Sequence, residues 1–220
     1  MPIIPTPRRK EIDHRTMKLI VGVVAITLPG LTSLFAKASL ASISASYWEG
    51  GPSQSIFIGF LFAIASFLLA YNGYSRPEMI LSKVASVASL GIALFPCQCD
   101  QPAAGVPVVH FASAATMFLI LAFFCYAFYR RARAKGHSEA NVRAIIYVVC
   151  GVAIVLSILV LALDAVLGRP LSGRLPRLTF YGEATALIAF GISWLIASRT
   201  LPVVTRPDER FSPLRENNPA

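Results

Sequence analysis

The chain has 220 residues, of which 55% belong to the apolar class and only 14% are charged, and its formal net charge is +9. A soluble domain usually carries about 25% charged residues, so this composition excludes an ordinary soluble domain and indicates a membrane protein. The basic residues stand in short clusters between apolar stretches, which favours a role in membrane orientation and disfavours nucleic acid as a partner.

Apolar stretches long enough to cross a bilayer recur along the chain, since a spanning helix needs roughly 20 mostly apolar residues. Six stretches meet or approach this length. The third is short and rich in small residues, so a count of five, with the third as an interfacial helix, is the alternative. The first contains Pro29 and Gly30, which predict a kink. The six stretches lie at about 17–36, 54–72, 79–96, 107–129, 144–167 and 179–198.

Lys and Arg concentrate on the cytoplasmic flanks of membrane helices. They are dense before the first stretch, in the connection 130–143 and after the last stretch. The sequence therefore predicts an all-α polytopic transmembrane bundle of six helices over residues 17–198. A basic head (1–16) and a disordered tail (199–220) would both lie in the cytoplasm, and the membrane would be the plasma (inner) membrane. The opposite side would carry only Lys37, Arg169, Arg174 and Arg177.

Two residue patterns indicate how the helices pack and where the membrane ends. Small residues at four-residue spacing let helices approach closely in lipid, so we expect packing faces at Gly59 and Ala63, at Ser82 and Ser86, and at Ala189, Ser193 and Ala197. Aromatic residues near the cytoplasmic flanks are typical of an interfacial belt: Tyr71, Tyr74, Tyr126, Phe128 and Tyr129.

Ionisable groups inside membrane segments are costly and are functional candidates by default. Here the centres of the spans carry none, and His110, Asp164 and Glu183 all lie near the predicted non-cytoplasmic rim. This asymmetry predicts a cavity open to that face. The segment 36–48 would cover its mouth as an interfacial helix or as an extension of the first span. The candidate polar site consists of Tyr47, Glu49, Asp100, His110, Asp164 and Glu183.

Cys97 and Cys99 could join His110 and one of the nearby carboxylates as metal ligands, with zinc or monovalent copper as the metal. A Cys-x-Cys pair alone is a weak signal, however, and no second histidine is near, so no cofactor is predicted. A strained, reducible disulfide is one alternative, and loop thiols with a packing role are another. His110 could likewise be structural, and Asp164 and Glu183 could pair with the arginines of the connection 168–178.

Four stretches of the chain, at 43–74, 89–96, 142–155 and 181–198, resemble a family of uncharacterised six-helix bacterial membrane proteins, grouped with the domain of unknown function 998. They include "SLGIALFP" and "YGEATALIAFGISWLIAS". The resemblance implies six helices with both termini inside, and it implies no established activity. The Cys-x-Cys loop departs from the family's usual loop. The shared positions fall on Tyr47, Gly73, Tyr74, Pro96, His110, Tyr147, Cys150, Gly151, Glu183 and Trp194.

These observations favour a non-enzymatic multi-pass protein that binds a lipid, another hydrophobic ligand or a partner helix through the predicted cavity. One alternative is a membrane-surface enzyme, or a metal or redox site, using His110, Asp164, Glu183 and the Cys97/Cys99 pair. Another is an accessory subunit of a larger membrane complex. A transporter is less favoured, because ion paths usually leave ionisable groups or broken helices near the midplane.

Overall fold

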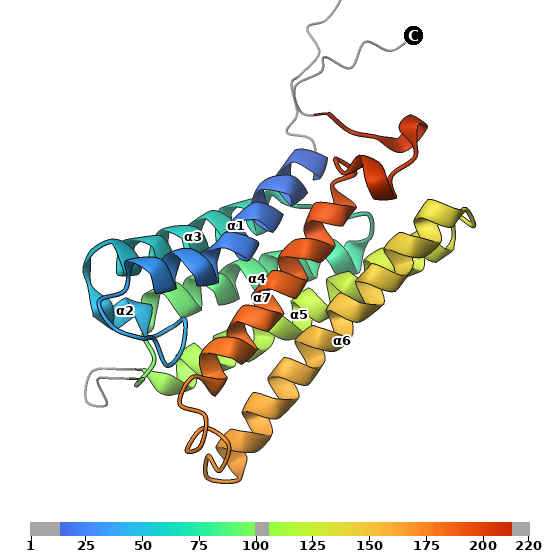
Figure 1. The fold of residues 1–220 in the computed structure, drawn as a ribbon. Coiled ribbons are helices and arrows are strands. Elements are labelled where there is room, and N and C mark those ends of the chain that lie inside the picture. Colours follow the sequence, from blue (N-terminus) through green and yellow to red (C-terminus); the bar gives the residue numbers. More distant parts are fainter. Residues whose placement is uncertain (1–13, 100–105, 213–220) are drawn as a thin grey trace, which may run out of the picture.

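The computed structural model describes residues 14–99 and 106–212, and this part of the chain contains helices and no strand (Figure 1). Six helices are long, α2 has a single turn, and two short 3-10 helices follow the last long one. The elements are α1 (His14–Phe35), α2 (Ser46–Glu49), α3 (Gly51–Ala70), α4 (Arg76–Leu94), α5 (Pro107–Arg133), α6 (Ser138–Val166), α7 (Leu178–Ala197), η1 (Pro202–Val204) and η2 (Pro207–Glu209).

All six long helices are long and apolar enough to cross a membrane, so the chain is a multi-pass membrane protein. The predicted helical bundle with six spans is confirmed, and α4 is a full span of 19 residues. The main differences are at the helix ends. Helix α5 continues to Arg133 and α6 already begins at Ser138, because a helix does not have to stop where its apolar stretch stops. Helix α4 begins at Arg76, where the Ser75 hydroxyl accepts a hydrogen bond from the Glu78 amide.

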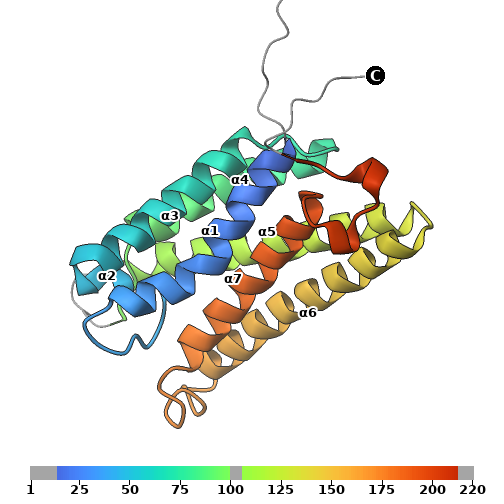
Figure 2. The same ribbon diagram turned by 45° about the horizontal axis from the view of Figure 1, so that its top comes forward.

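The long helices run alternately up and down, and each packs against the next in the chain (Figures 1 and 2). Helix α7 also packs against α1, so the six helices close into a ring. We call the end that holds the start of α1, the connections 71–75 and 134–137, and the tail (residues 198–212) the terminal end. The disulfide end is the opposite one, with the connections 36–50 and 167–177, residues 95–99 and Val106.

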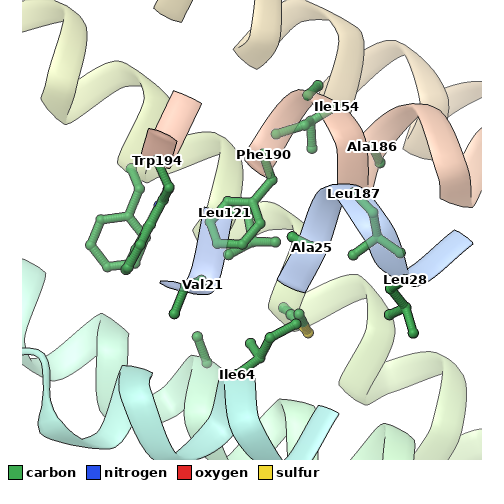
Figure 3. Close-up of a cluster of buried hydrophobic side chains, with 14 of the residues drawn as sticks. Val21, Ala25, Leu28, Ile64, Leu121, Ile154, Ala186, Leu187, Phe190 and Trp194 are labelled. Carbon is green, nitrogen blue, oxygen red and sulfur yellow. The ribbon is translucent and has the colours of Figure 1, made fainter. Parts of the chain in front are cut away.

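The core is centred where α1 and α7 meet (Figure 3). Val21, Phe190 and Trp194 are fully buried there. The two backbones come so close that a Cβ atom built on Gly191 would lie 2.7 Å from the carbonyl oxygen of Gly22. These two glycines therefore set the distance between the first and last spans.

Helices α3 and α4 are joined by serine hydroxyls that donate to backbone carbonyls. Ser86 Oγ lies 2.7 Å from the Ala65 carbonyl oxygen, and Ser89 Oγ lies 2.9 Å from that of Leu61. The predicted packing face at Ser82 and Ser86 is thus present. Gly59, in contrast, is exposed, and a Cβ built on it would meet nothing within 4 Å.

Three expectations about the two ends need correction. The segment 36–45 is irregular and folds inward, with Leu40 and Ile43 each 2% exposed, because its apolar side chains cap the open end of the helix ring. Residues 199–212 of the expected disordered tail form two 3-10 helices and bury Phe211, while 213–220 lie outside the described residues. Tyr71 and Phe128 are buried in the bundle, not set in an interfacial belt.

Candidate functional site

The disulfide end is closed by a segment that we call the plug, residues 36–50. Its side chains alternate in role: Leu40, Ile43 and Ala45 are buried among apolar neighbours, and Ser42 and Ser44 are buried beside polar ones. Such a segment needs internal partners for its backbone, because it forms no helix before Ser46. The polar residues of this end supply several of these partners.

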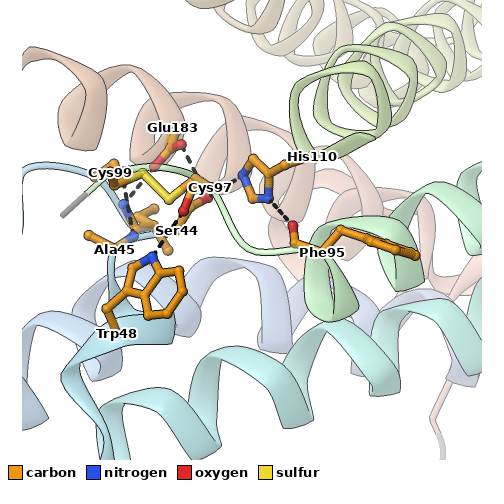
Figure 4. Close-up of a disulfide and its surroundings, with 10 residues drawn as sticks. Ser44, Ala45, Trp48, Phe95, Cys97, Cys99, His110 and Glu183 are labelled. Carbon is orange, nitrogen blue, oxygen red and sulfur yellow. Dashed lines mark hydrogen bonds between the residues drawn. A yellow bond between two sulfur atoms is a disulfide. The ribbon is translucent and has the colours of Figure 1, made fainter. Parts of the chain in front are cut away.

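Glu183, near the start of α7, holds the plug by its backbone (Figure 4). Its Oε2 accepts a hydrogen bond of 2.6 Å from the Ile43 amide, and its Oε1 lies 3.5 Å from Ser44 Oγ. On the other side of the same hydroxyl, His110 Nε2 lies 3.1 Å away. His110 Nδ1 lies 2.9 Å from the Phe95 carbonyl oxygen, which can only accept, so Nδ1 carries the proton. The Ser44 hydroxyl has one proton, which it donates either to Nε2 of the neutral ring or to Glu183 Oε1.

The chain Glu183–Ser44–His110 brings together two of the predicted site residues, but in an order that does not suit nucleophilic catalysis. In a serine triad, the histidine lies between the nucleophile and the carboxylate. Here the serine lies in the middle and is 6% exposed, and His110 is anchored to a backbone carbonyl. This arrangement fixes the plug against α5 and α7.

The other predicted site residues serve separate local bonds. Asp164 accepts from the amide of Leu171 at 2.7 Å and so closes the turn after α6. Glu49 accepts from the amide of Lys37 at 2.9 Å, and Tyr47 packs edge-on against the ring of Trp48. Asp100 lies outside the described residues. Glu183 was expected to pair with arginines of the connection 168–178, but it binds the plug. Of these arginines, Arg177 donates from Nε to the Leu40 carbonyl oxygen at 3.1 Å.

Cys97 and Cys99 form a disulfide, and the indole of Trp48 donates to the Cys97 carbonyl at 3.0 Å (Figure 4). In this state, neither sulfur is a thiolate that could bind a metal. Within residues 14–99 and 106–212, no three side chains of His, Cys, Asp or Glu converge as metal ligands. His110 is committed to Phe95 and Ser44, so the predicted metal set of Cys97, Cys99 and His110 is not assembled in this structure.

Two hollows lie away from this cluster, and the sequence reasoning missed both. The first is a groove of about 650 Å³ between α4 and α5, with apolar walls that include Val84, Val87, Leu94 and Val109. Its only sequence signal is the small residues along α4. Neither hollow is lined by His110, Asp164 or Glu183. His110 and Glu183 bind the plug, and Asp164 binds the turn after α6.

The second hollow is a pocket of about 300 Å³ at the terminal end, which we call the basic pocket. It lies between α1, α5, α6, α7 and the tail. The sequence places its basic side chains in and just after the head, in the connection 130–143 and in the tail, where they look like simple orientation signals. Their convergence depends on the folded tail and on the closed ring. The charged side chains that line it are Arg15, Lys18, Arg131, Lys135, Arg199, Asp208 and Glu209.

Comparison with known proteins gives no match, whether with family models, curated proteins or solved structures. The resemblance to the six-helix family of unknown function therefore stays a prediction.

Proposed function

We propose that this protein is a multi-pass protein of the bacterial plasma (inner) membrane that binds a lipid acyl chain, or a similar elongated apolar ligand, between α4 and α5. The observation that carries the proposal is the groove between these helices. The ligand class is the one predicted from the sequence. The binding position differs, because the groove lies on the lipid-facing side of the bundle and not at the disulfide end.

The groove has the size and the chemistry of a site for an apolar ligand. Ligand pockets usually have about 300–1,000 Å³ and apolar walls with a few polar groups, and this groove has about 650 Å³. Ser113 and Thr116 supply hydroxyl groups on the α5 side of the groove. Lys83 lies in the part of the groove that is closest to the terminal end of the bundle. A ligand with an apolar chain would find contact along both helices.

The sequence explains why the seam between α4 and α5 is hollow. Ala88, Gly91 and Ala112 put little or no side chain where the two helices face the membrane. At Gly91 the helices nearly touch, since a Cβ there would lie 2.2 Å from Ser113 Oγ. If the groove is empty, the side chains that line it lack dispersion contacts on one side. An acyl chain that enters the groove supplies these contacts.

The test is to fill the groove and measure co-purified lipid by native mass spectrometry. Ala112→Phe places a ring in the groove, whereas Ala115→Phe makes the same change at an exposed position of α5 that does not line it. Ala112→Phe should lose most of the bound lipid, and Ala115→Phe should keep it. Equal lipid content in both variants contradicts the proposal. A lipid-free wild type that migrates with a second protein in native gels favours the partner-helix alternative.

A further inference from the structure

The basic pocket holds more positive than negative charge, and its negative charges are already engaged. Glu209 forms ion pairs with Lys135, Arg143 and Arg199. Asp208 is 70% exposed and points to Arg206 at 3.4 Å. Neither of these carboxylates forms an ion pair with Lys18, which lies on the α1 side of the pocket.

Lys18 of α1 is the most deeply buried cation of the pocket, with an exposed fraction of 3%. Its ammonium lies 5.0 Å from the ring centre of Tyr74 and 5.4 Å from those of Tyr71 and Phe128. Within the described ranges, no carboxylate is close enough for an ion pair with Lys18, and its ammonium makes no hydrogen bond. Aromatic faces stabilise such a cation only in part, so an anion bound beside Lys18 would lower the free-energy cost of burying its charge.

Two further donors beside Lys18 are buried without a hydrogen-bond partner in the part of the chain that the structure describes. They are Nη2 of Arg131 and the hydroxyl of Tyr71. Arg131 uses its Nη1 to bind Glu78, and its guanidinium lies over the rings of Tyr74 and Phe128. Burial raises the pKa of Tyr71, so its hydroxyl stays protonated as a donor. Unsatisfied buried donors in a native protein often mark the place of a water or an ion.

We propose that the basic pocket binds a phosphate group, with Lys18 and Arg131 as its direct partners and with Arg15 and Arg199 at its rim. A guanidinium matches the geometry of phosphate oxygens, and an ammonium adds a point charge. Basic pockets between membrane helices are typical sites for anionic headgroups. The phosphate belongs either to an anionic lipid headgroup or to a soluble phosphate, and the experiment separates these two sources. This site is independent of the groove between α4 and α5.

Phosphate binding is tested on the purified full-length protein by its thermal unfolding midpoint in a neutral detergent, because a ligand that binds the folded state raises it. The soluble probe is inorganic phosphate, with chloride at equal ionic strength as its control. The lipid probe is phosphatidylglycerol in mixed micelles, with phosphatidylcholine as its control. The wild type should be stabilised by inorganic phosphate or by phosphatidylglycerol beyond the matching control.

Lys18→Met keeps an apolar stem of similar length and should weaken the apparent affinity by about tenfold or more. Arg206→Gln removes one charge from the same end outside the pocket and should bind like the wild type, as should Ala112→Phe. If Lys18→Met does not fold, Arg131→Lys is used; it keeps the charge but loses the guanidinium that matches phosphate oxygens, so it should bind several times more weakly.

Each outcome of these titrations has a definite meaning. Stabilisation by phosphatidylglycerol alone assigns the phosphate to a lipid headgroup, and stabilisation by inorganic phosphate assigns it to a soluble ligand. Absence of both responses overturns the proposal. Equal weakening by Lys18→Met and Arg206→Gln also overturns it, because the response would then depend only on the net charge of this end.

Discussion

Glu209 is the residue on which the docking of the tail depends most. Its Oε2 lies 2.9 Å from Arg143 Nη2 and 2.6 Å from Arg199 Nη1, and its Oε1 binds Lys135. Burial alone would raise the pKa of Glu209, but the hydrogen bond from Lys135 and the charges of Arg199 and Arg143 outweigh burial and lower the pKa to about 2. Since the folded pKa lies below the usual 4.5, ionised Glu209 stabilises the docked tail above about pH 4.5. This stabilisation is lost as the pH falls from there towards 2.

The docking can be followed by the distance between spin labels on Val203→Cys in η1 and Ala134→Cys in the α5–α6 connection, both exposed positions. The distance distribution should be narrow at pH 7 and should broaden as the pH falls below about 4.5. Glu209→Gln should be broad already at pH 7, because it removes charged hydrogen bonds worth about 1.5–3 kcal/mol each. Asp208→Asn is the neighbouring control and should resemble the wild type. A narrow distribution in Glu209→Gln would show that apolar contacts such as Phe211 suffice.

At the scale of helices, the contact between α1 and α7 depends on the absence of side chains at Gly22 and Gly191. A Cβ on Gly191 would lie 2.6 Å from Cγ1 of Ile26, and on Gly22 it would lie 2.9 Å from the Gly191 carbonyl oxygen. Gly191→Ala should therefore push the helices apart and lower the free energy of unfolding by about 1–3 kcal/mol. Gly59→Ala, at an exposed position of α3, should raise it by about 0.5–1 kcal/mol, because alanine favours the helix. Unfolding in mixed detergent measures both, and a neutral Gly191→Ala would contradict the close packing.

The sequence predicts the six spans well, because every span lies in the same hydrocarbon environment. Each span must satisfy its backbone internally and face hydrocarbon, so composition alone identifies it. The plug could not be predicted in this way. Its apolar residues Leu40 and Ile43 follow no helical spacing, and its order depends on Glu183 and His110 from distant parts of the chain. Those two residues were recognised as special from their position near the rim, but their role as anchors depends on contacts that a sequence does not display.

The two hollows were missed for a related physical reason. The groove exists because small residues of α4 and α5 face each other, and each helix by itself only shows a packing stripe. In the basic pocket, Lys18, Arg131 and Arg199 belong to α1, α5 and the tail, and only the closed ring brings them to one place. Tyr71 also looked like a belt residue, because interfacial and buried tyrosines have the same position relative to the end of a span.

For the whole molecule, the end that faces the cytoplasm determines on which side of the membrane the basic pocket lies. Two independent observations support a cytoplasmic terminal end. The described connections of the disulfide end contain only four basic residues, Lys37, Arg169, Arg174 and Arg177, and the terminal end holds the basic pocket and the arginine-rich end of α5. The Cys97–Cys99 disulfide, at the opposite end, suits an oxidising compartment.

We expect an impermeant maleimide to label Arg174→Cys in intact spheroplasts and to label Ala134→Cys only after the membrane is opened. Both positions are exposed, and the native background is low because Cys97 and Cys99 form a disulfide and Cys125 and Cys150 are buried. This result would put the basic pocket beside the cytoplasmic leaflet, whose anionic lipids attract basic side chains. Labelling of Ala134→Cys in intact spheroplasts would reverse the orientation. The pocket would then face the outside, and the lipid arm of the phosphate experiment would have to be judged against the outer leaflet instead.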